Sequence, residues 1–336
     1  MKSRIDAIEY YLPGNPVLNA DLSNKNPHWQ MDKVESKTGV LSRHFAAENE
    51  TAFDMAVKAC EKLFDSTGLS PLDIDGIVFC TQSPDYVMPS NAFLIHEFFQ
   101  MSSRTLAFDF NLACSGYVYG LAITSSLLNS GLAKNILLIT ADTYSKFINP
   151  KDRSTMSLFG DAAAVSLITQ DDSGSELVDI IMETSGKDYK SFYVPAGGCR
   201  IPFSDESLKE ETDLSGNTRS LEDIYMNGFG VWKFIAGVVP GQIEELLKRN
   251  DISKNDINCY IFHQASKMTL DSLTKALKLS DDKVFSNLSH VGNTVSASIP
   301  VAMKDAYDKG IIKRGDVLLL SGFGVGLSWA SALIKF

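Results

Sequence analysis

Cys114 occupies a position from which a cysteine side chain can act as a nucleophile. The apolar run LAFDF ends shortly before it, and the small residues Ser115 and Gly116 lead into a segment that we expect to be helical over 115–130. Backbone N–H groups and the dipole at a helix N-terminus favour the thiolate, which is the nucleophilic form of the side chain. The alternative is a buried cysteine that only fills space. We expect that structural role for the other four cysteines, Cys60, Cys80, Cys199 and Cys259.

Two further residues carry side chains suited to catalysis. His263 follows the apolar run CYIF, where a predicted strand ends before a helix at 266–278, and α/β sheets gather functional residues at strand carboxyl ends. Asn293 stands ahead of a predicted helix at 297–309, and its amide can donate a hydrogen bond to an oxyanion or enolate. Each residue has a structural alternative. His263 can be an ordinary hydrogen-bonded histidine, and Asn293 can cap the helix that follows it.

The glycine-rich segment SGFGVGLSWA, near the C-terminus, has the look of a dinucleotide-binding loop. Ten residues follow Gly326, and their apolar character predicts a strand instead of a helix whose N-terminus binds pyrophosphate. We therefore exclude a nucleotide site there. A glycine-lined turn can instead bring a backbone N–H close to a reacting carbonyl and complete an oxyanion hole.

The elements that position these residues form two related halves. Residues 131–168 contain GLAKNILLITADT and SLFGDAAAVSLI, and residues 310–334 contain GIIKRGDVLLLSGFG and SWASALI. In both stretches a charged turn leads into an apolar run, and an FG dipeptide leads into another. Short runs rich in Val, Ile and Leu without strict alternation are typical of strands covered on both faces. Predicted helices alternate with these runs over residues 50–67, 90–101, 115–130, 228–249, 266–278 and 297–309.

This alternation predicts a duplicated α/β fold with helices layered on its sheets. We place the halves at residues 1–170 and 171–336, divided where TQDDSGSE interrupts the pattern, so that the first half carries Cys114 and the second the other two residues. Residues 186–222 are polar and irregular, and we expect a surface excursion over the second half that covers a site.

Composition excludes several classes of function. The net charge of −10 and the pI of about 5.0 argue against a nucleic-acid partner. The five cysteines include no CxxC pair and the histidines no HxH or HxxxH spacing, so we expect neither a metal site nor a disulfide framework. There is no signal-peptide pattern and no apolar run near the roughly 20 residues that a membrane span requires, so we expect a cytoplasmic protein without a membrane partner.

The cysteine at a helix start, the HQA and GNT segments and the glycine-rich turn near the C-terminus together resemble the β-ketoacyl-acyl-carrier-protein synthase III family of the thiolase superfamily. The resemblance runs from NADL at residue 19 to Phe336, through KTGVLSRHFAAENET, ACSG, NPKDRSTMSLFGDAAA, HQA, HVGNTVSASIPVAM and GFGVGLSWASALIKF. It implies an α/β, thiolase-like duplicated fold, layered α-β-α-β-α with two mixed sheets. It also implies a catalytic triad of Cys114, His263 and Asn293.

The resemblance further implies a reaction. An acyl-CoA acylates Cys114, and a malonyl thioester, usually on acyl carrier protein, then loses CO₂ and condenses with the bound acyl group, as in fatty acid biosynthesis or a related pathway. Backbone N–H groups of Cys114 and Val325 form the oxyanion hole for the acyl carbonyl, while His263 and Asn293 bind the malonyl thioester oxygen. Members are homodimers in which the stretch around Met88 reaches the neighbouring acyl pocket. No cofactor is implied beyond acyl-CoA as a substrate.

Several positions depart from the family pattern around the substrate. Trp29 is out of register with the tryptophan that stacks on the adenine of CoA, and Lys33 falls there instead. Lys37 replaces an arginine, Gln82 stands where many members carry a small hydroxyl residue, and Val325 replaces a glycine. The substrate-binding residues carried over from the family are Lys37, Gln82, Met88, Arg153, Trp232 and Ser266. Those expected to dock a carrier protein are Lys233, Gln264, Lys267, Met268 and Lys275.

Two other functions stay open at the level of sequence. A relative of these enzymes can transfer the cysteine-bound acyl group to oxygen or nitrogen, without needing a working His-Asn pair. A non-catalytic partner subunit can bind acyl carrier protein, although such subunits typically lose the cysteine. Within the leading function, an unpaired Gln82 amide beside the acyl chain predicts a preference for short or polar acyl donors, because an aliphatic chain leaves the amide without a partner.

Overall fold

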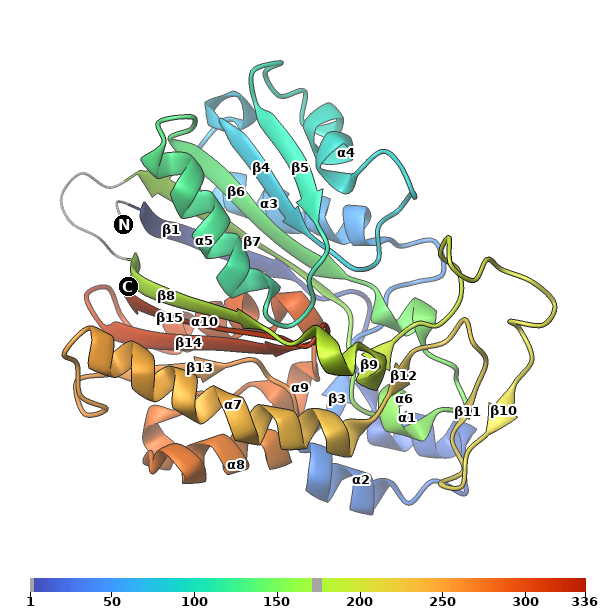
Figure 1. Ribbon diagram of the computed structural model, residues 1–336. Helices are drawn as coiled ribbons and strands as arrows, with labels where there is room; N and C mark the ends of the chain where they lie inside the picture. The colour runs from blue at the N-terminus through green and yellow to red at the C-terminus, as the bar shows by residue number, and fades with distance from the viewer. Residues whose placement is uncertain (1–2, 171–176) are drawn as a thin grey trace.

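Two mixed β-sheets form the framework of the computed structural model, which describes residues 3–170 and 177–336 (Figure 1). Among the described residues the larger sheet has five strands in the order β1-β7-β6-β4-β5. They are β1 (Ser3–Tyr11), β7 (Ala162–Gln170), β6 (Asn135–Asp142), β4 (Gly76–Cys80) and β5 (Leu106–Phe110). The smaller sheet, again within the described ranges, has four strands in the order β13-β14-β15-β8. They are β13 (Cys259–Phe262), β14 (Val317–Gly324), β15 (Ser328–Lys335) and β8 (Leu177–Thr184).

The pairing of the strands confirms the duplication expected from the sequence. In the larger sheet β4 runs parallel to β6, and β6, β7 and β1 then pair antiparallel. In the smaller sheet β13 runs parallel to β14, and β14, β15 and β8 pair antiparallel in the same way. All strands of the larger sheet precede residue 171, and all strands of the smaller sheet follow residue 176. The division near residue 170 itself stays a prediction, because residues 171–176 lie outside the described residues.

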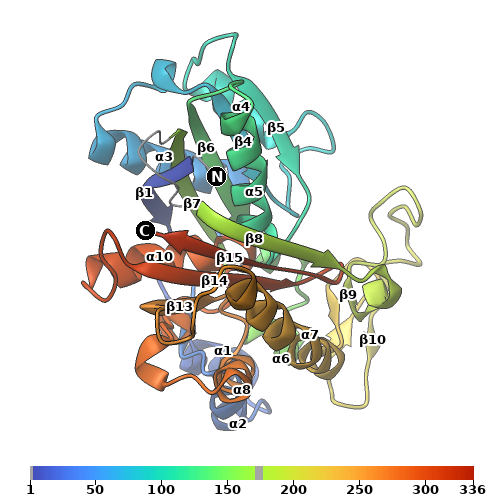
Figure 2. The ribbon, with the colours of Figure 1, turned by 60° about the vertical axis from the view of Figure 1, so that its left-hand side comes forward.

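Helices fill the space between the sheets and cover their outer faces (Figures 1 and 2). The middle layer consists of α5 (Gly116–Asn129), which contacts strands of both sheets, and α10 (Ser298–Asp308). The outer layers consist of α3 (Ala52–Thr67) and α4 (Asn91–Phe98) on the larger sheet, and α7 (Gly228–Arg249) and α8 (Lys267–Leu277) on the smaller one. The α-β-α-β-α layering predicted above is therefore confirmed, and the six predicted helices are present with their ends shifted by up to three residues.

Burial on two sides explains why α5 is apolar around most of its circumference. Its residues Val118, Leu121 and Leu128 belong to a core that continues into β4, β6, β14 and β15. Gly120 lets the helix lie close to the larger sheet, since a Cβ atom at that position would stand 2.5 Å from Leu138 Cδ1. The helix that begins just after Cys114 is thus fixed tightly against β6.

Short helices, 3₁₀ segments and short strands complete the described structure. The short helices are α1 (Asn19–Lys25), α2 (Met31–Thr38), α6 (Arg153–Met156) and α9 (Leu288–Val291). Short 3₁₀ segments span Pro71–Asp73, Tyr144–Phe147, Gly186–Ser191, Asp281–Lys283 and Val295–Ala297. The short strands pair as β2 (Val17–Leu18) with β3 (Ser42–Arg43), β9 (Phe192–Tyr193) with β12 (Tyr225–Met226), and β10 (Glu211–Thr212) with β11 (Thr218–Arg219).

The excursion expected over residues 186–222 is present, but its anchorage differs from the prediction. It is tied largely to residues of the first half. The Arg219 guanidinium donates to the fully buried Asp152 carboxylate at 2.5 Å, and Lys151 pairs with Glu210 at 2.6 Å. These ion pairs hold the excursion against the segment that leads into α6, in the first half, whereas the prediction placed it over the second half.

Candidate active site

Cys114, His263 and Asn293 converge from three separate parts of the chain on one cavity of about 460 Å³. Cys114 lies between the end of β5 and the start of α5, and His263 directly follows β13. Asn293 lies between α9 and the 3₁₀ turn Val295–Ala297. One half of the fold thus supplies the cysteine, and the other supplies the histidine and the asparagine.

The thiol of Cys114 lies 3% exposed, beneath the turn that ends β14. Gly324 makes this approach possible, because a Cβ atom there would stand 2.9 Å from both Cβ and Sγ of Cys114. Burial raises the pKa of the Cys114 thiol, and the Asp142 carboxylate adds to this effect, while backbone N–H groups of Cys114 and Val325 that hydrogen-bond the sulfur oppose it. Backbone N–H groups therefore favour the thiolate, as predicted from the sequence, but burial has the larger effect on the pKa and acts in the opposite direction.

Asp142 was not singled out from the sequence, yet it connects the cysteine side of the site to the asparagine side. Its buried carboxylate accepts from the Gln82 backbone N–H at 2.8 Å and from the hydroxyl of Ser296, three residues after Asn293. Burial raises the pKa of Asp142 to about 7. The signal in the sequence was its place at the carboxyl end of β6, the strand next to β4.

His263 is buried and held by its Nδ1 atom, which lies 2.6 Å from the Ser298 hydroxyl at the start of α10. Its ring meets the edge of Phe323 with the centroids 5.6 Å apart. Burial lowers the pKa of His263 to about 3, so the imidazole is neutral at physiological pH. Because Nδ1 is bonded to Ser298, Nε2 is the ring nitrogen that can form a hydrogen bond with a ligand in the cavity.

The amide of Asn293 is oriented by the turn that follows it. Its Oδ1 accepts the Val295 N–H at 3.0 Å, which leaves Nδ2 as the group turned to other partners, and Nδ2 makes one long contact of 3.4 Å with the Ala265 carbonyl. Val295 adopts φ +53°, a strained conformation for a β-branched residue that places its N–H under the amide. The alternative that Asn293 caps the next helix is wrong, because Ala297 is the N-cap of α10.

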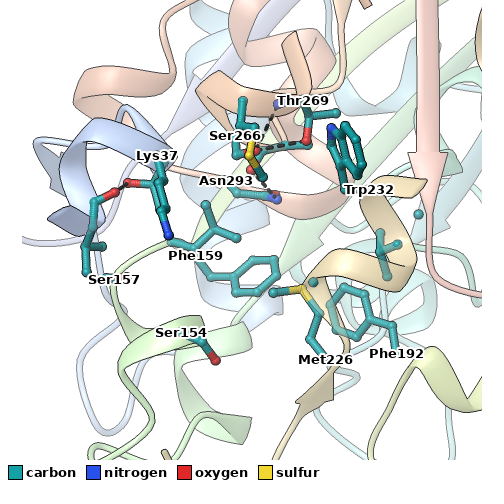
Figure 3. A pocket seen from close by; sticks show the side chains of 18 of the residues that line it. Lys37, Ser154, Ser157, Phe159, Phe192, Met226, Trp232, Ser266, Thr269 and Asn293 are labelled. Carbon is teal, nitrogen blue, oxygen red and sulfur yellow. Dashed lines mark hydrogen bonds between the residues drawn. The ribbon is translucent and has the colours of Figure 1, made fainter. Parts of the chain in front are cut away.

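The lining of the cavity changes character along its length. Figure 3 shows Phe159, Phe192 and Met226 gathered at one end, and Ser266 with Trp232 at another. Ser266 also caps α8, since its hydroxyl accepts the Thr269 N–H at 3.2 Å. The site thus combines an apolar end with polar groups near α8.

The mouth of the cavity is basic although the protein is acidic overall. Lys33 and Lys37 of α2 and Arg153 of α6 line it, and both lysines are exposed. Such a cluster suits a ligand that carries phosphate groups.

Trp232 of α7 lines the same cavity with an unsatisfied donor. Its indole Nε1 is buried, and no hydrogen-bond partner for it occurs among the described residues. A buried donor without a partner is costly.

The five residues expected to dock a carrier protein differ in exposure. Lys233 and Lys275 are exposed, Met268 is 47% exposed, and Lys267 is exposed while pairing with Asp271 at 2.6 Å. Gln264 is fully buried, and its amide donates to the Phe262 carbonyl at 2.7 Å and accepts from the Ser286 hydroxyl at 2.7 Å. A docking role for Gln264 is wrong, because a side chain without exposure cannot contact a partner protein.

Gln82 and Met88 lie outside the lining of the cavity that contains Cys114, His263 and Asn293. Gln82 lines a second cavity, and its amide accepts from the Tyr144 hydroxyl at 2.5 Å and donates to Asn111 Oδ1 at 2.8 Å. The amide is paired, so the unpaired amide assumed from the sequence is wrong. Met88 is 80% exposed beside Val87, which is 97% exposed.

Within residues 3–170 and 177–336, no helix combines the length and the apolar character that crossing a membrane demands. In the same ranges, no group of three or more His, Cys, Asp and Glu residues is arranged to hold a metal ion.

Comparisons with known proteins agree with one another. The family described as 3-oxoacyl-[acyl-carrier-protein (ACP)] synthase III matches residues 108–186, and the C-terminal region described under the same name matches residues 247–336. A β-ketoacyl-[acyl-carrier-protein] synthase III from Caldanaerobacter subterraneus is 36% identical over 97% of this chain and 95% of its own length. The protein of the same name from Fusobacterium nucleatum is 32% identical over 99% of this chain and 98% of its own.

Solved structures give the same result. A crystal structure of a 3-oxoacyl-(acyl-carrier-protein) synthase III superposes with a TM-score of 0.97 at 38% identity, covering 100% of both chains. The priming β-ketosynthase of the R1128 polyketide pathway superposes with a TM-score of 0.86 at 25% identity, covering 99% of this chain and 96% of that one.

Proposed function

The chain belongs to the β-ketoacyl-[acyl-carrier-protein] synthase III family of thiolase-fold condensing enzymes, and from this premise we propose that Cys114, His263 and Asn293 catalyse its condensation. The observation that carries the assignment is the convergence of these side chains on one cavity, with two backbone N–H groups on the cysteine sulfur. The proposed substrates are an acyl-CoA and a malonyl thioester on acyl carrier protein, and the pathway is fatty acid biosynthesis or a related one.

In the first step, the Cys114 sulfur attacks the thioester carbonyl of acyl-CoA. A carbon–sulfur bond forms to the cysteine, the bond to the CoA sulfur breaks, and the cysteine proton leaves with the CoA thiol. The N–H groups of Cys114 and Val325, which already point at the sulfur, are well placed to bind the tetrahedral oxyanion. Because the resting group is a thiol, we propose that its proton is transferred as the bond forms.

In the second step, the malonyl thioester occupies the vacated part of the cavity. Its carbon–carboxylate bond breaks, CO₂ leaves, and the thioester oxygen takes the negative charge of an enolate. Neutral His263, with its proton on Nε2 when Ser298 donates to Nδ1, would donate one hydrogen bond to this oxygen. Asn293 Nδ2 would donate another, since Oδ1 is engaged by the Val295 N–H.

The enolate carbon then attacks the acyl carbon, and the Cys114 thiolate leaves and recovers a proton. The product is a β-ketoacyl thioester. Each step is a substitution or a decarboxylation at a thioester, so we propose that no metal or redox cofactor takes part.

Substrate binding follows from the shape of the cavity. Lys37 and Arg153, with Lys33, are proposed to bind the phosphates of CoA or of the carrier's phosphopantetheine. Trp232 and Ser266, which line the cavity near α8, are proposed to contact the pantetheine arm. The exposed Lys233, Lys267, Met268 and Lys275 on α7 and α8 are proposed to contact the carrier.

We further propose a cytoplasmic homodimer. Val87 and Met88 expose large apolar side chains side by side, which is unfavourable unless a partner covers them. In the proposed dimer, Met88 approaches the acyl cavity of the neighbouring copy. Sedimentation velocity of wild type and Met88→Asp tests this, and two identical monomeric species would contradict it.

The proposed reaction is tested by intact mass. Purified protein and a Cys114→Ala variant are each incubated with a panel of acyl-CoAs, and we expect a mass gain from at least one donor that is absent in the variant. Adding malonyl-carrier should then remove the adduct and release CO₂. Transfer to oxygen or nitrogen instead would discharge the adduct without CO₂ release, and a non-catalytic subunit would show no adduct with any donor.

A further inference from the structure

A second cavity of about 390 Å³ adjoins the proposed catalytic site. Phe192 lines both cavities, and Val325, whose backbone N–H bonds the Cys114 sulfur, lines the second. The rings of Tyr144, Phe159 and Phe192 pack between the two spaces with centroids 5.4 to 6.3 Å apart. A group attached to Cys114 thus lies beside this second space.

A row of hydrogen-bonded polar side chains runs along one wall of the second cavity. Strands β6, β4 and β5 are adjacent and parallel, so their carboxyl ends meet at one edge of the sheet. Tyr144 follows β6, Gln82 follows β4 and Asn111 follows β5. Gln82, in the middle, accepts from the Tyr144 hydroxyl at 2.5 Å and donates to Asn111 Oδ1 at 2.8 Å. The Gln82 backbone N–H is bound by Asp142, which fixes the row.

The direction of these bonds determines what the row can still offer. An amide nitrogen carries two hydrogens, and Gln82 Nε2 uses one of them on Asn111. Gln82 Oε1 accepts from Tyr144 and Asn111 Oδ1 accepts from Gln82, whereas the second hydrogen on Gln82 Nε2 and the Nδ2 group of Asn111 have no hydrogen-bond partner among the described residues. The row therefore retains amide N–H groups with which an oxygen acceptor can pair.

A negative charge limits which acceptor fits. Glu222 lines the same cavity, and one of its carboxylate oxygens accepts from the Ser207 hydroxyl at 2.5 Å. A second carboxylate in this space would be repelled, whereas a neutral hydroxyl or carbonyl oxygen would not.

From these observations we infer that the row Asn111–Gln82–Tyr144 selects the acyl donor, favouring a neutral acyl group with an oxygen acceptor along its chain over a plain alkyl group of the same length. This inference rests on the proposed acylation of Cys114. An alkyl chain that fills the cavity deprives the amide N–H groups of water and supplies no acceptor, whereas a hydroxyl or carbonyl oxygen pairs with them.

The test compares matched four-carbon donors by the initial rate at which Cys114 gains mass. The donors are butyryl-CoA, 3-hydroxybutyryl-CoA, 4-hydroxybutyryl-CoA, acetoacetyl-CoA and the anionic succinyl-CoA. We expect at least one neutral oxygenated donor to react about 10-fold faster than butyryl-CoA, and succinyl-CoA to react more slowly than that donor. Butyryl-CoA as the fastest donor, or succinyl-CoA equal to the best, overturns the inference.

Substitutions in the row Asn111–Gln82–Tyr144 test whether these residues cause the preference for oxygenated donors. Gln82→Leu should bring the ratio of oxygenated to butyryl donor close to one. Because Gln82→Leu leaves the Tyr144 hydroxyl unpaired, the double variant Gln82→Leu/Tyr144→Phe removes both partners together and should give the same ratio in a well-folded protein. Tyr307→Phe, which changes a tyrosine packed on Phe336 in another cavity, is the control and should keep the wild-type ratio.

The possible failures are distinct. A ratio unchanged in both row variants overturns the inference while leaving the proposed reaction intact, since the adduct still forms. Absence of an adduct with every donor, acetyl-CoA included, contradicts the proposed acylation and the inference together.

Discussion

The close approach of Gly324 to Cys114 gives a sharp prediction. Replacing Gly324 with Ala adds a methyl group whose carbon would stand 2.9 Å from both Cβ and Sγ of the cysteine, whereas ordinary contacts begin at 3.4 Å. The cysteine, or the turn that carries the Val325 N–H, must therefore move by about 0.5 Å. Gly324 lies outside the left-handed region, so the effect of the substitution is steric and not conformational.

The magnitude follows from this displacement. Overpacking of a tight interior costs about 1–3 kcal/mol of unfolding free energy. A misplacement of about 1 Å at a reacting centre costs about 100-fold in rate, so a shift of half that size should slow acylation of Cys114 about 10-fold. We expect Gly324→Ala to remain folded and its rate of Cys114 acylation to fall by more than its loss of unfolding free energy accounts for.

The assay measures both quantities on the same preparation. Denaturant unfolding gives the free energy of unfolding, and time-resolved intact mass gives the acylation rate with a reactive donor. Gly237→Ala is the matched control, because no atom of a neighbouring group stands within 4 Å of its new methyl carbon and the helix α7 should gain about 1 kcal/mol from alanine. An acylation rate within twofold of wild type in Gly324→Ala would refute the reasoning that this turn fixes the nucleophile.

Four further predictions concern the histidine and the excursion. Ser298→Ala removes the hydrogen-bond partner of His263 Nδ1, so the tautomer with its proton on Nε2 is less stabilised. The rate of CO₂ release from malonyl-carrier should fall about 10-fold while the rate of Cys114 acylation stays unchanged. Equal losses in both rates would contradict this. Because burial lowers the pKa of His263 from about 6.5 in an unfolded chain to about 3, the folded protein keeps it neutral from pH 5 to 8, and CO₂ release should show no acid limb from this group. The same shift means that the free energy of unfolding falls as the pH drops below about 6.5, where the histidine of the unfolded chain takes up a proton. Denaturant unfolding at several pH values should therefore show a smaller fall in the free energy of unfolding for His263→Asn than for the wild type. Arg219→Met strands the fully buried Asp152 carboxylate and should cost about 3 kcal/mol of stability, whereas Lys209→Met at an exposed ion pair should cost under about 1 kcal/mol; similar losses would contradict a buried anchor.

Much of the fold was predictable because its signals are local. Apolar runs of four to eight residues marked β6, β7, β14 and β15, and helical periodicity placed α7 and α8 to within a residue. The anchorage of the excursion was not predictable in this way. It depends on Arg219 reaching Asp152, 67 positions earlier in the chain, and nothing near either residue identifies the other.

The sequence by itself determined that a cysteine and a histidine follow predicted strands and that an asparagine precedes a predicted helix, and hence that the three are available for one site. Only the tertiary structure decided their states. Burial raised the pKa of Cys114 against the effect of its helix, and Ser298, 35 positions away, took Nδ1 of His263. Gln82 became paired because β5 and β6 flank β4, and Gln264 turned inward. The physical reason is that desolvation, charge and hydrogen bonding depend on neighbours in space, which local sequence patterns do not specify.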